Sequence, residues 1–162
     1  MLLRIFFLFL FFLFQLAVRD NLLFFGFAPN LLIIGLVLTV KKNNLLDGVL
    51  LGAGCGLLYD LVSYGYFGFG IFSLTLSGFL TAFFKKQVFT DNAGSKMLIA
   101  FLLTLLNGII SLFVINYFYV PVNLTREFVR VVLPEALCTS VFLGALLLLF
   151  YFFGSKTKKV KG

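Results

Sequence analysis

Four residues on one apolar stretch could build a binding surface with an acid at its end. Gly48, Gly52, Gly56 and Asp60 recur every fourth position in a segment that is nearly free of charge. On a helix this spacing aligns them on one face. Glycines let another helix backbone approach closely. The stripe therefore predicts a helix-packing or partner interface that ends in a carboxylate.

Asp60 is the residue of this stripe with chemistry of its own. An ionisable side chain inside a membrane span is costly and marks a functional candidate. The cationic residues expected on its side of the membrane are Arg19, Arg126 and Arg130. A structural ion pair or helix-loop clamp, contact with a partner, and a step in ion or proton transfer all remain open. The third role lacks a histidine or a second intramembrane acid to complete a relay.

The chain offers no residue set for the common catalytic mechanisms. It contains no histidine, which excludes Ser-His and Cys-His pairs, and no GxSxG, HExxH or Walker motif occurs. Cys55 and Cys138 stand alone, without the spacing of a zinc site or a redox pair. We therefore expect a protein without catalytic residues, metal or cofactor.

The composition places these residues in a membrane. Of the 162 residues, 62% are hydrophobic and only 12% are charged, and the mean hydropathy is +1.13. A soluble fold of this size could not bury so much apolar surface, whereas a bilayer accepts it on the outside. The net charge of +7 comes from short clusters between apolar runs, which is typical of topology signals and not of nucleic-acid binding.

The apolar runs predict an all-α integral membrane protein with six transmembrane helices in a single domain, residues 1–153. The second run carries Pro29 and Asn30, and a helix starting there would be about 18 Å long, too short for a core of about 30 Å. Residues from Leu22 must therefore contribute to that span. The expected spans are 5–18, 22–40, 45–62, 69–84, 97–120 and 131–153.

The distribution of basic residues predicts that both termini are cytoplasmic. With six helices, ten lysines and arginines fall on the side of the termini and three on the other. Four of the ten lie in the basic tail, residues 154–162, which either enforces this topology or contacts anionic lipid.

The second to fourth spans resemble the rod shape-determining protein MreD family of bacteria. In that family a Pro-Asn or Pro-Asp opening of an apolar helix precedes a glycine-rich helix ending in Gly-Leu-Leu-x-Asp, with glycines just beyond. The corresponding residues of this chain are Pro29, Asn30, Gly56, Leu57, Leu58, Asp60, Gly65 and Gly68. The likeness extends over the whole length in size, helix number and basic ends.

The resemblance implies a non-catalytic scaffold of the cell-elongation complex in the bacterial cytoplasmic membrane. MreC is the expected partner, and RodA, a class B penicillin-binding protein and MreB are further members, in direct or indirect contact. The resemblance also implies a six-helix fold similar to the substrate-binding subunits of energy-coupling-factor transporters. The alternative function is therefore that of a vitamin-binding subunit of such a transporter.

Overall fold

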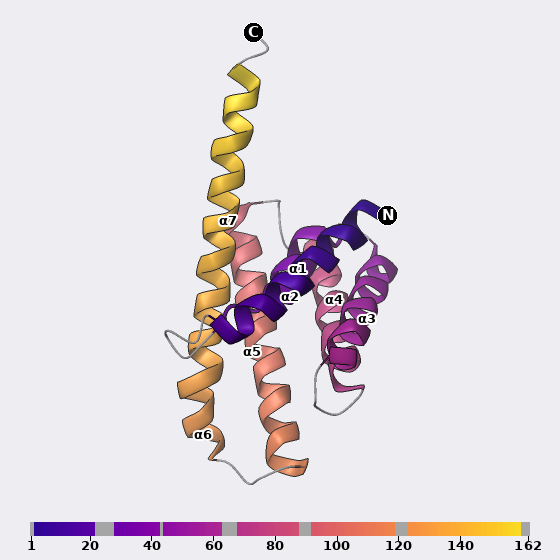
Figure 1. Ribbon diagram of the computed structural model, residues 1–162, viewed down its shortest axis with the longest axis vertical. Coiled ribbons are helices and arrows are strands. Elements are labelled where there is room, and N and C mark those ends of the chain that lie inside the picture. The colour runs from indigo at the N-terminus through magenta and orange to yellow at the C-terminus, as the bar shows by residue number, and fades with distance from the viewer. Residues whose placement is uncertain are drawn as a thin grey trace.

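The computed structural model describes residues 2–21, 28–42, 44–62, 68–87, 92–118 and 123–159, which form a bundle of helices (Figure 1). No strand occurs in these ranges, so the all-α prediction is confirmed. The elements are α1 (Leu2–Asn21), α2 (Leu31–Thr39), α3 (Leu45–Val62), α4 (Phe69–Gln87), α5 (Ala93–Phe118), α6 (Leu124–Glu127), the π-helix η2 (Phe128–Val132) and α7 (Leu133–Lys159). The last three, α6, η2 and α7, follow one another without a break and form one helical run.

Within the described ranges, three helical segments are long and apolar enough to cross a membrane: Leu45–Val62, Ala93–Phe118 and Leu124–Phe152. The prediction of transmembrane helices is confirmed by these segments. Two of them begin earlier than the expected spans at 97 and 131, because helical hydrogen bonding continues into the polar residues that precede the apolar run. The start of α1 and the end of α7 lie at the same end of the bundle (Figure 1).

The short helix α2 forms the centre of the bundle. Its residues from Leu31 to Val37 are all buried, and it contacts α1, α3, α4, α5 and α7. With nine residues it is about 14 Å long, which is too short to span the apolar layer of a membrane. Asn30 caps its start, where the side-chain Oδ1 accepts a hydrogen bond of 3.3 Å from the amide of Ile33. The expected contribution of 22–27 to this span lies outside the described residues.

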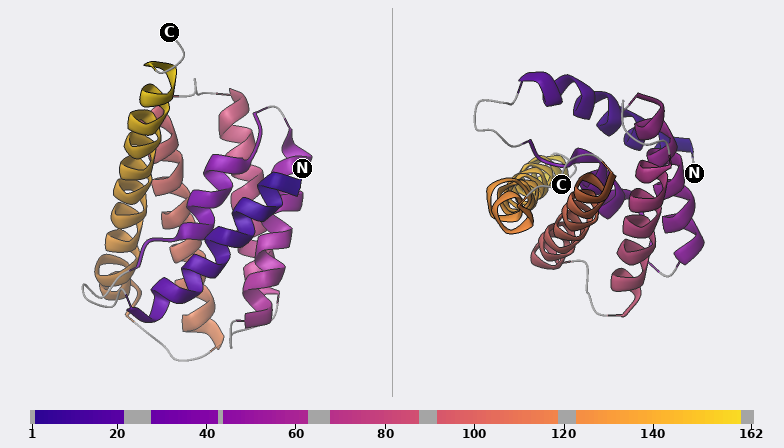
Figure 2. Two further views of the ribbon diagram at one scale, coloured as in Figure 1. Left: turned by 45° about the horizontal axis from the view of Figure 1, so that its top comes forward. Right: turned by 90° about the horizontal axis from the view of Figure 1, so that it is seen from below.

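Helix α1 crosses the outside of the bundle at a slant to α5 and α7 (Figure 2). Leu8 and Phe12 are buried, while Phe6, Leu10 and Phe14 are exposed. Gly35 of α2 supports this crossing, since a Cβ at that position would lie 3.0 Å from a methyl carbon of Leu8. An apolar exposed face of this kind is stable against lipid.

Candidate functional site

The glycine stripe of Gly48, Gly52 and Gly56 packs against α4 of the same chain. A Cβ added at Gly48 or Gly52 would come within 3.0 Å of the carbonyl oxygens of Gly78 and Leu74, respectively. At Gly56 it would meet the backbone at the start of α4. The two helices therefore touch through their backbones, and van der Waals packing holds them together.

This packing leaves no room for a partner at the stripe. The sequence allowed the glycine stripe to pack either within the chain or against another protein. In the structure all three glycines are buried within the chain. The opposite face of α3 is open instead, where Leu46, Leu50, Leu57 and Leu61 are exposed. A partner of α3 must therefore approach from that opposite face.

The Asp60 carboxylate binds the first amides of α4. Its Oδ1 accepts a hydrogen bond of 2.8 Å from Gly70, and its Oδ2 accepts bonds of 2.8 Å and 3.0 Å from Gly68 and Ile71. The side chain is only 7% exposed, yet its charge is held by three amides at the positive end of a helix. Gly68 adopts a φ of 101°, which favours glycine. The motif residue Gly65 lies outside the described residues.

An ion pair between Asp60 and an arginine, one of the roles that the sequence left open, is not found for the two candidate arginines that the structure describes. Arg126 and Arg130 are exposed, and neither forms a hydrogen bond or ion pair with Asp60. The side chain of Arg19 lies outside the described residues. The backbone amides of α4 replace the arginine because they supply donors and positive potential without a second buried charge.

The remaining motif residues have separate structural tasks. Pro29 and Asn30 precede the first turn of α2. Proline disfavours extension of the helix toward the N-terminus, and the asparagine side chain caps the helix. Leu57 is exposed on α3, whereas Leu58 packs against the core. The motif therefore serves the start of one helix and the seam between two others.

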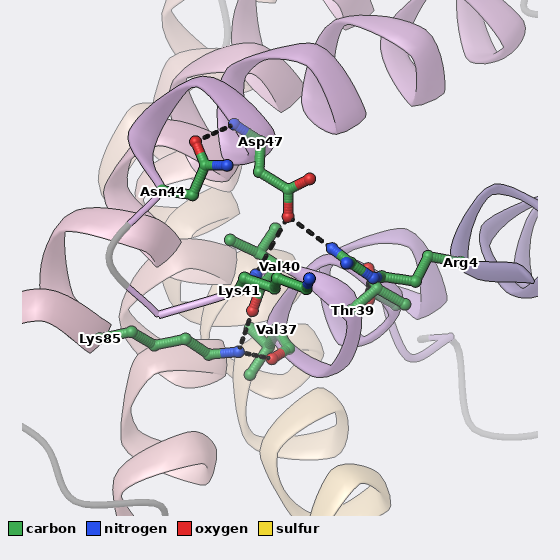
Figure 3. Close-up of polar contacts among 9 residues, drawn as sticks. Arg4, Val37, Thr39, Val40, Lys41, Asn44, Asp47 and Lys85 are labelled. Atoms are coloured by element: carbon green, nitrogen blue, oxygen red, sulfur yellow. Dashed lines mark hydrogen bonds and ion pairs between the residues drawn. The ribbon is translucent and has the colours of Figure 1, made fainter. Parts of the chain in front are cut away.

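An ion pair joins α1 to α3 at the end of the bundle that carries the chain termini. Arg4 Nη1 donates to Asp47 Oδ2 over 2.7 Å, and the same oxygen accepts the backbone amide of Lys41 over 3.2 Å (Figure 3). Asn44 caps α3 through a bond of 3.1 Å from the Asp47 amide. Asp47 lies in the first turn of α3, where the helix dipole favours an acid, and its charged partner is Arg4 of α1.

Lys85 closes the carboxyl end of α2 at the same end of the bundle. Its Nζ donates to the carbonyl oxygens of Val37 at 2.5 Å and Val40 at 2.8 Å (Figure 3). These oxygens lie at the end of α2, where Val37 and Val40 are buried, and buried carbonyl groups without a donor are costly. Lys85, expected only as a topology signal, therefore also satisfies the backbone of the central helix.

A cavity of about 360 Å³ lies among α1, α2, α3, α4, α5 and the run from η2 to α7. Its lining residues sit at the ends of the helices away from the chain termini. Several of its walls are apolar, including Leu32, Leu74 and Val132. The polar residues that line it are Gln15, Asn30, Tyr59, Ser73, Asn107, Ser111 and Glu135.

Glu135 and Asn107 are the polar residues of this lining that bear most on what the cavity could bind. The Glu135 carboxyl group is hydrogen-bonded to the Asn30 side chain. Asn107 Oδ1 is buried and has no partner among the described residues. Glu135 follows Pro134, and this pair is typical of a helix start. Because α7 continues from α6 and η2, Glu135 instead lies within a long helix and faces the interior, so a second intramembrane acid does exist.

Comparison with known proteins identifies the family. The family model described as rod shape-determining protein MreD matches residues 1–157, nearly the whole chain. No curated protein and no solved structure matches, so the expected likeness to transporter subunits has no support from a solved fold. The family predicted from the motif residues is confirmed. The chain belongs to the MreD family of rod shape-determining proteins.

Proposed function

We propose that this protein is a non-catalytic membrane scaffold of the rod-shape machinery in the bacterial cytoplasmic membrane. It binds MreC and thereby supports peptidoglycan synthesis along the side wall of the cell. The observation that carries the proposal is the family match over residues 1–157. A chain with no histidine and no catalytic motif fits a subunit that acts by holding others in place.

The same proposal places both termini in the cytoplasm. Ten of the thirteen basic residues fall on the side of the termini, and the start of α1 and the end of α7 share one end of the bundle. MreB can then contact the cytoplasmic end of this protein, where the basic tail of residues 154–162 lies next to anionic lipid. RodA and the class B penicillin-binding protein act on the other side or through MreC.

The face between α1 and α3 is the best candidate for the membrane anchor of MreC. An apolar groove of about 430 Å³ runs there between Phe6 and Phe9 of α1 and Leu50 and Leu58 of α3. Gly54 forms part of its lining, and a Cβ at Gly54 would meet nothing within 4 Å. A single apolar helix fits such a surface, because an exposed glycine lets it approach the backbone of α3.

Co-purification in a mild detergent tests this proposal. Tagged wild-type protein should retain MreC, and Gly54→Leu should lose most of it without a lower unfolding temperature. Gly94→Leu is the matched control, because Gly94 is also open but lies at the start of α5. Equal recovery of MreC with both variants would place the anchor elsewhere. No recovery with the wild type would remove the support for the scaffold function.

A further inference from the structure

The cavity of about 360 Å³ contains a carboxyl group, and its described lining holds no cationic side chain. Glu135 is the charged residue of the lining, and Lys and Arg are absent from it among the described residues. A carboxylate removed from water needs an opposite charge or several donors. In the described structure Glu135 has the Asn30 side chain alone, and Asn30 also caps α2. The described walls of the cavity therefore do not balance the charge of a Glu135 carboxylate.

The unmet groups of the cavity are hydrogen-bond acceptors. Asn107 also lines the cavity, and its Oδ1 is buried and lacks a donor in the described part of the chain. A buried acceptor without a donor costs about 1–3 kcal/mol. A ligand that carries N–H donors would supply a counter-charge at Glu135. Rotation of the Asn107 side chain on binding would let its Oδ1 accept a hydrogen bond from the same ligand and recover this free energy.

The start of α2, which could attract an anion, is already satisfied by side chains. The amide of Asn30 donates to Thr139 Oγ1 at 2.9 Å, and the amide of Leu31 donates to Gln15 Oε1 at 2.7 Å. The amide of Ile33 donates to the Asn30 side chain. An anionic ligand would thus lose the usual amide donors of a helix start and would meet the Glu135 carboxylate. The hydrogen bonding selects for a cation.

We propose that this cavity binds a small ligand through an ammonium group, with Glu135 as its counter-ion and Asn107 Oδ1 as an acceptor. The volume is in the range of small-molecule sites. The rings of Tyr59 and Phe69 in the lining suit a cation, and the aliphatic walls suit a short carbon chain. The π-helix that supplies Val131 to the wall is a feature enriched at functional sites.

Two sources can deliver such an ammonium group. One is a free alkylamine, and the other is the ethanolamine headgroup of a lipid. Ile115 and Val131 line the cavity and are exposed, so the cavity reaches the surface of the bundle beside them. Both sources have the same chemistry at Glu135, and the experiment separates them.

The test uses the full-length protein in a mild detergent and a buffer without amines. Butylamine and ethanolamine should raise the unfolding temperature measured by circular dichroism, while butanol and butyrate at equal concentration should not. Glu135→Gln should weaken amine binding, measured by calorimetry, by roughly tenfold or more. Glu127→Gln is the matched control because Glu127 lies on the same helical run outside the cavity, and it should bind as the wild type does.

Asn107→Leu provides a second variant whose folding is not at risk. Replacing a buried acceptor that has no donor by an apolar group of similar size should leave the unfolding temperature equal or higher. Amine affinity should nevertheless fall several-fold, which a merely structural role would not produce. Unchanged affinity in both Glu135→Gln and Asn107→Leu, or equal stabilisation by butanol and butylamine, would overturn the proposal.

Native mass spectrometry from nanodiscs identifies the source of the ammonium group. Retention of phosphatidylethanolamine by the wild type and its loss in Glu135→Gln would assign the lipid headgroup. Calorimetric binding of butylamine in phosphatidylglycerol nanodiscs would assign a free amine. If neither occurs, the proposal fails. Recovery of MreC by Glu135→Gln would show separately that the scaffold function stands.

Discussion

The Oδ1 atom of Asp60 lies 2.8 Å from the backbone nitrogen of Gly70 and accepts its hydrogen bond. Asp60 is the last polar residue of α3, and Gly70 is in the first turn of α4. Gly70 has no space for a side chain, because a Cβ there would collide with the carboxylate. One carboxylate thus fixes how two helices meet, at the end of the seam that the glycine stripe forms.

Asp60→Asn should lower the free energy of unfolding by about 2–3 kcal/mol. Hydrogen bonds to a charged group are worth about 1.5–3 kcal/mol, and the asparagine NH2 group would face an amide donor. Unfolding of the purified protein, followed by circular dichroism in mixed micelles, measures the difference.

Glu127→Gln is the control for the loss of one negative charge, since Glu127 does not bond to α4. It should change stability by less than about 0.5 kcal/mol. An Asp60→Asn protein as stable as this control would show that the three amides contribute little to stability.

Gly52→Ala and Gly54→Ala should have opposite effects although both lie on α3. At Gly52 the added methyl group meets the backbone of α4, and overpacking of this kind costs about 1–3 kcal/mol. At Gly54 it meets open space and removes the entropy cost of glycine, a gain of about 0.5–1 kcal/mol. The unfolding temperatures of the two variants check the direction of each stability change. Destabilisation by both substitutions would contradict close packing of α4 on only one face of α3.

The periodicity of the sequence was sufficient to predict the stripe but not its partner. Spacing by four places Gly48, Gly52 and Gly56 on one face, because a helix has about 3.6 residues per turn. Which helix lies against that face depends on contacts between distant segments, and the matching small residue is Gly78 of α4. The partner of Asp60 escaped prediction for a similar reason, since backbone amides have no signature in the sequence.

The cavity could not be predicted from the sequence because its polar groups come from separate helices. Gln15, Asn107 and Glu135 are more than 25 positions apart and share no motif. Glu135 follows Pro134, a pair that is typical of a helix start. The structure continues the helix through this proline by a π-helical segment at Phe128–Val132, which moves Glu135 from a helix start to the interior.

Arg4 and Asp47 should show a positive coupling energy in a double-mutant cycle. Their side chains are 24% and 10% exposed, so solvent screens the pair less than at an open surface. We expect a coupling of about 0.5–1.5 kcal/mol between Arg4→Gln and Asp47→Asn in the free energy of unfolding. Because the pair connects α1 to α3, Arg4→Gln should also expose α1 to limited proteolysis. Strictly additive effects would mean that the two groups do not interact in solution.

Lys85→Met should destabilise the protein, whereas Lys86→Met should not. Both substitutions remove one positive charge from the last turn of α4. Lys85 Nζ satisfies the carbonyl groups of Val37 and Val40, and these would remain buried without it. Each unpaired carbonyl costs about 1–3 kcal/mol. Lys86 is exposed, so Lys86→Met removes the same topology signal as Lys85→Met but leaves the carbonyl groups at the end of α2 paired. The measurement is the unfolding temperature of both variants, together with the amount inserted in the membrane. A drop in unfolding temperature for Lys85→Met alone would show that Lys85 stabilises the end of the central helix. Equal loss of inserted protein in the two variants would show instead that the lysines act through membrane topology.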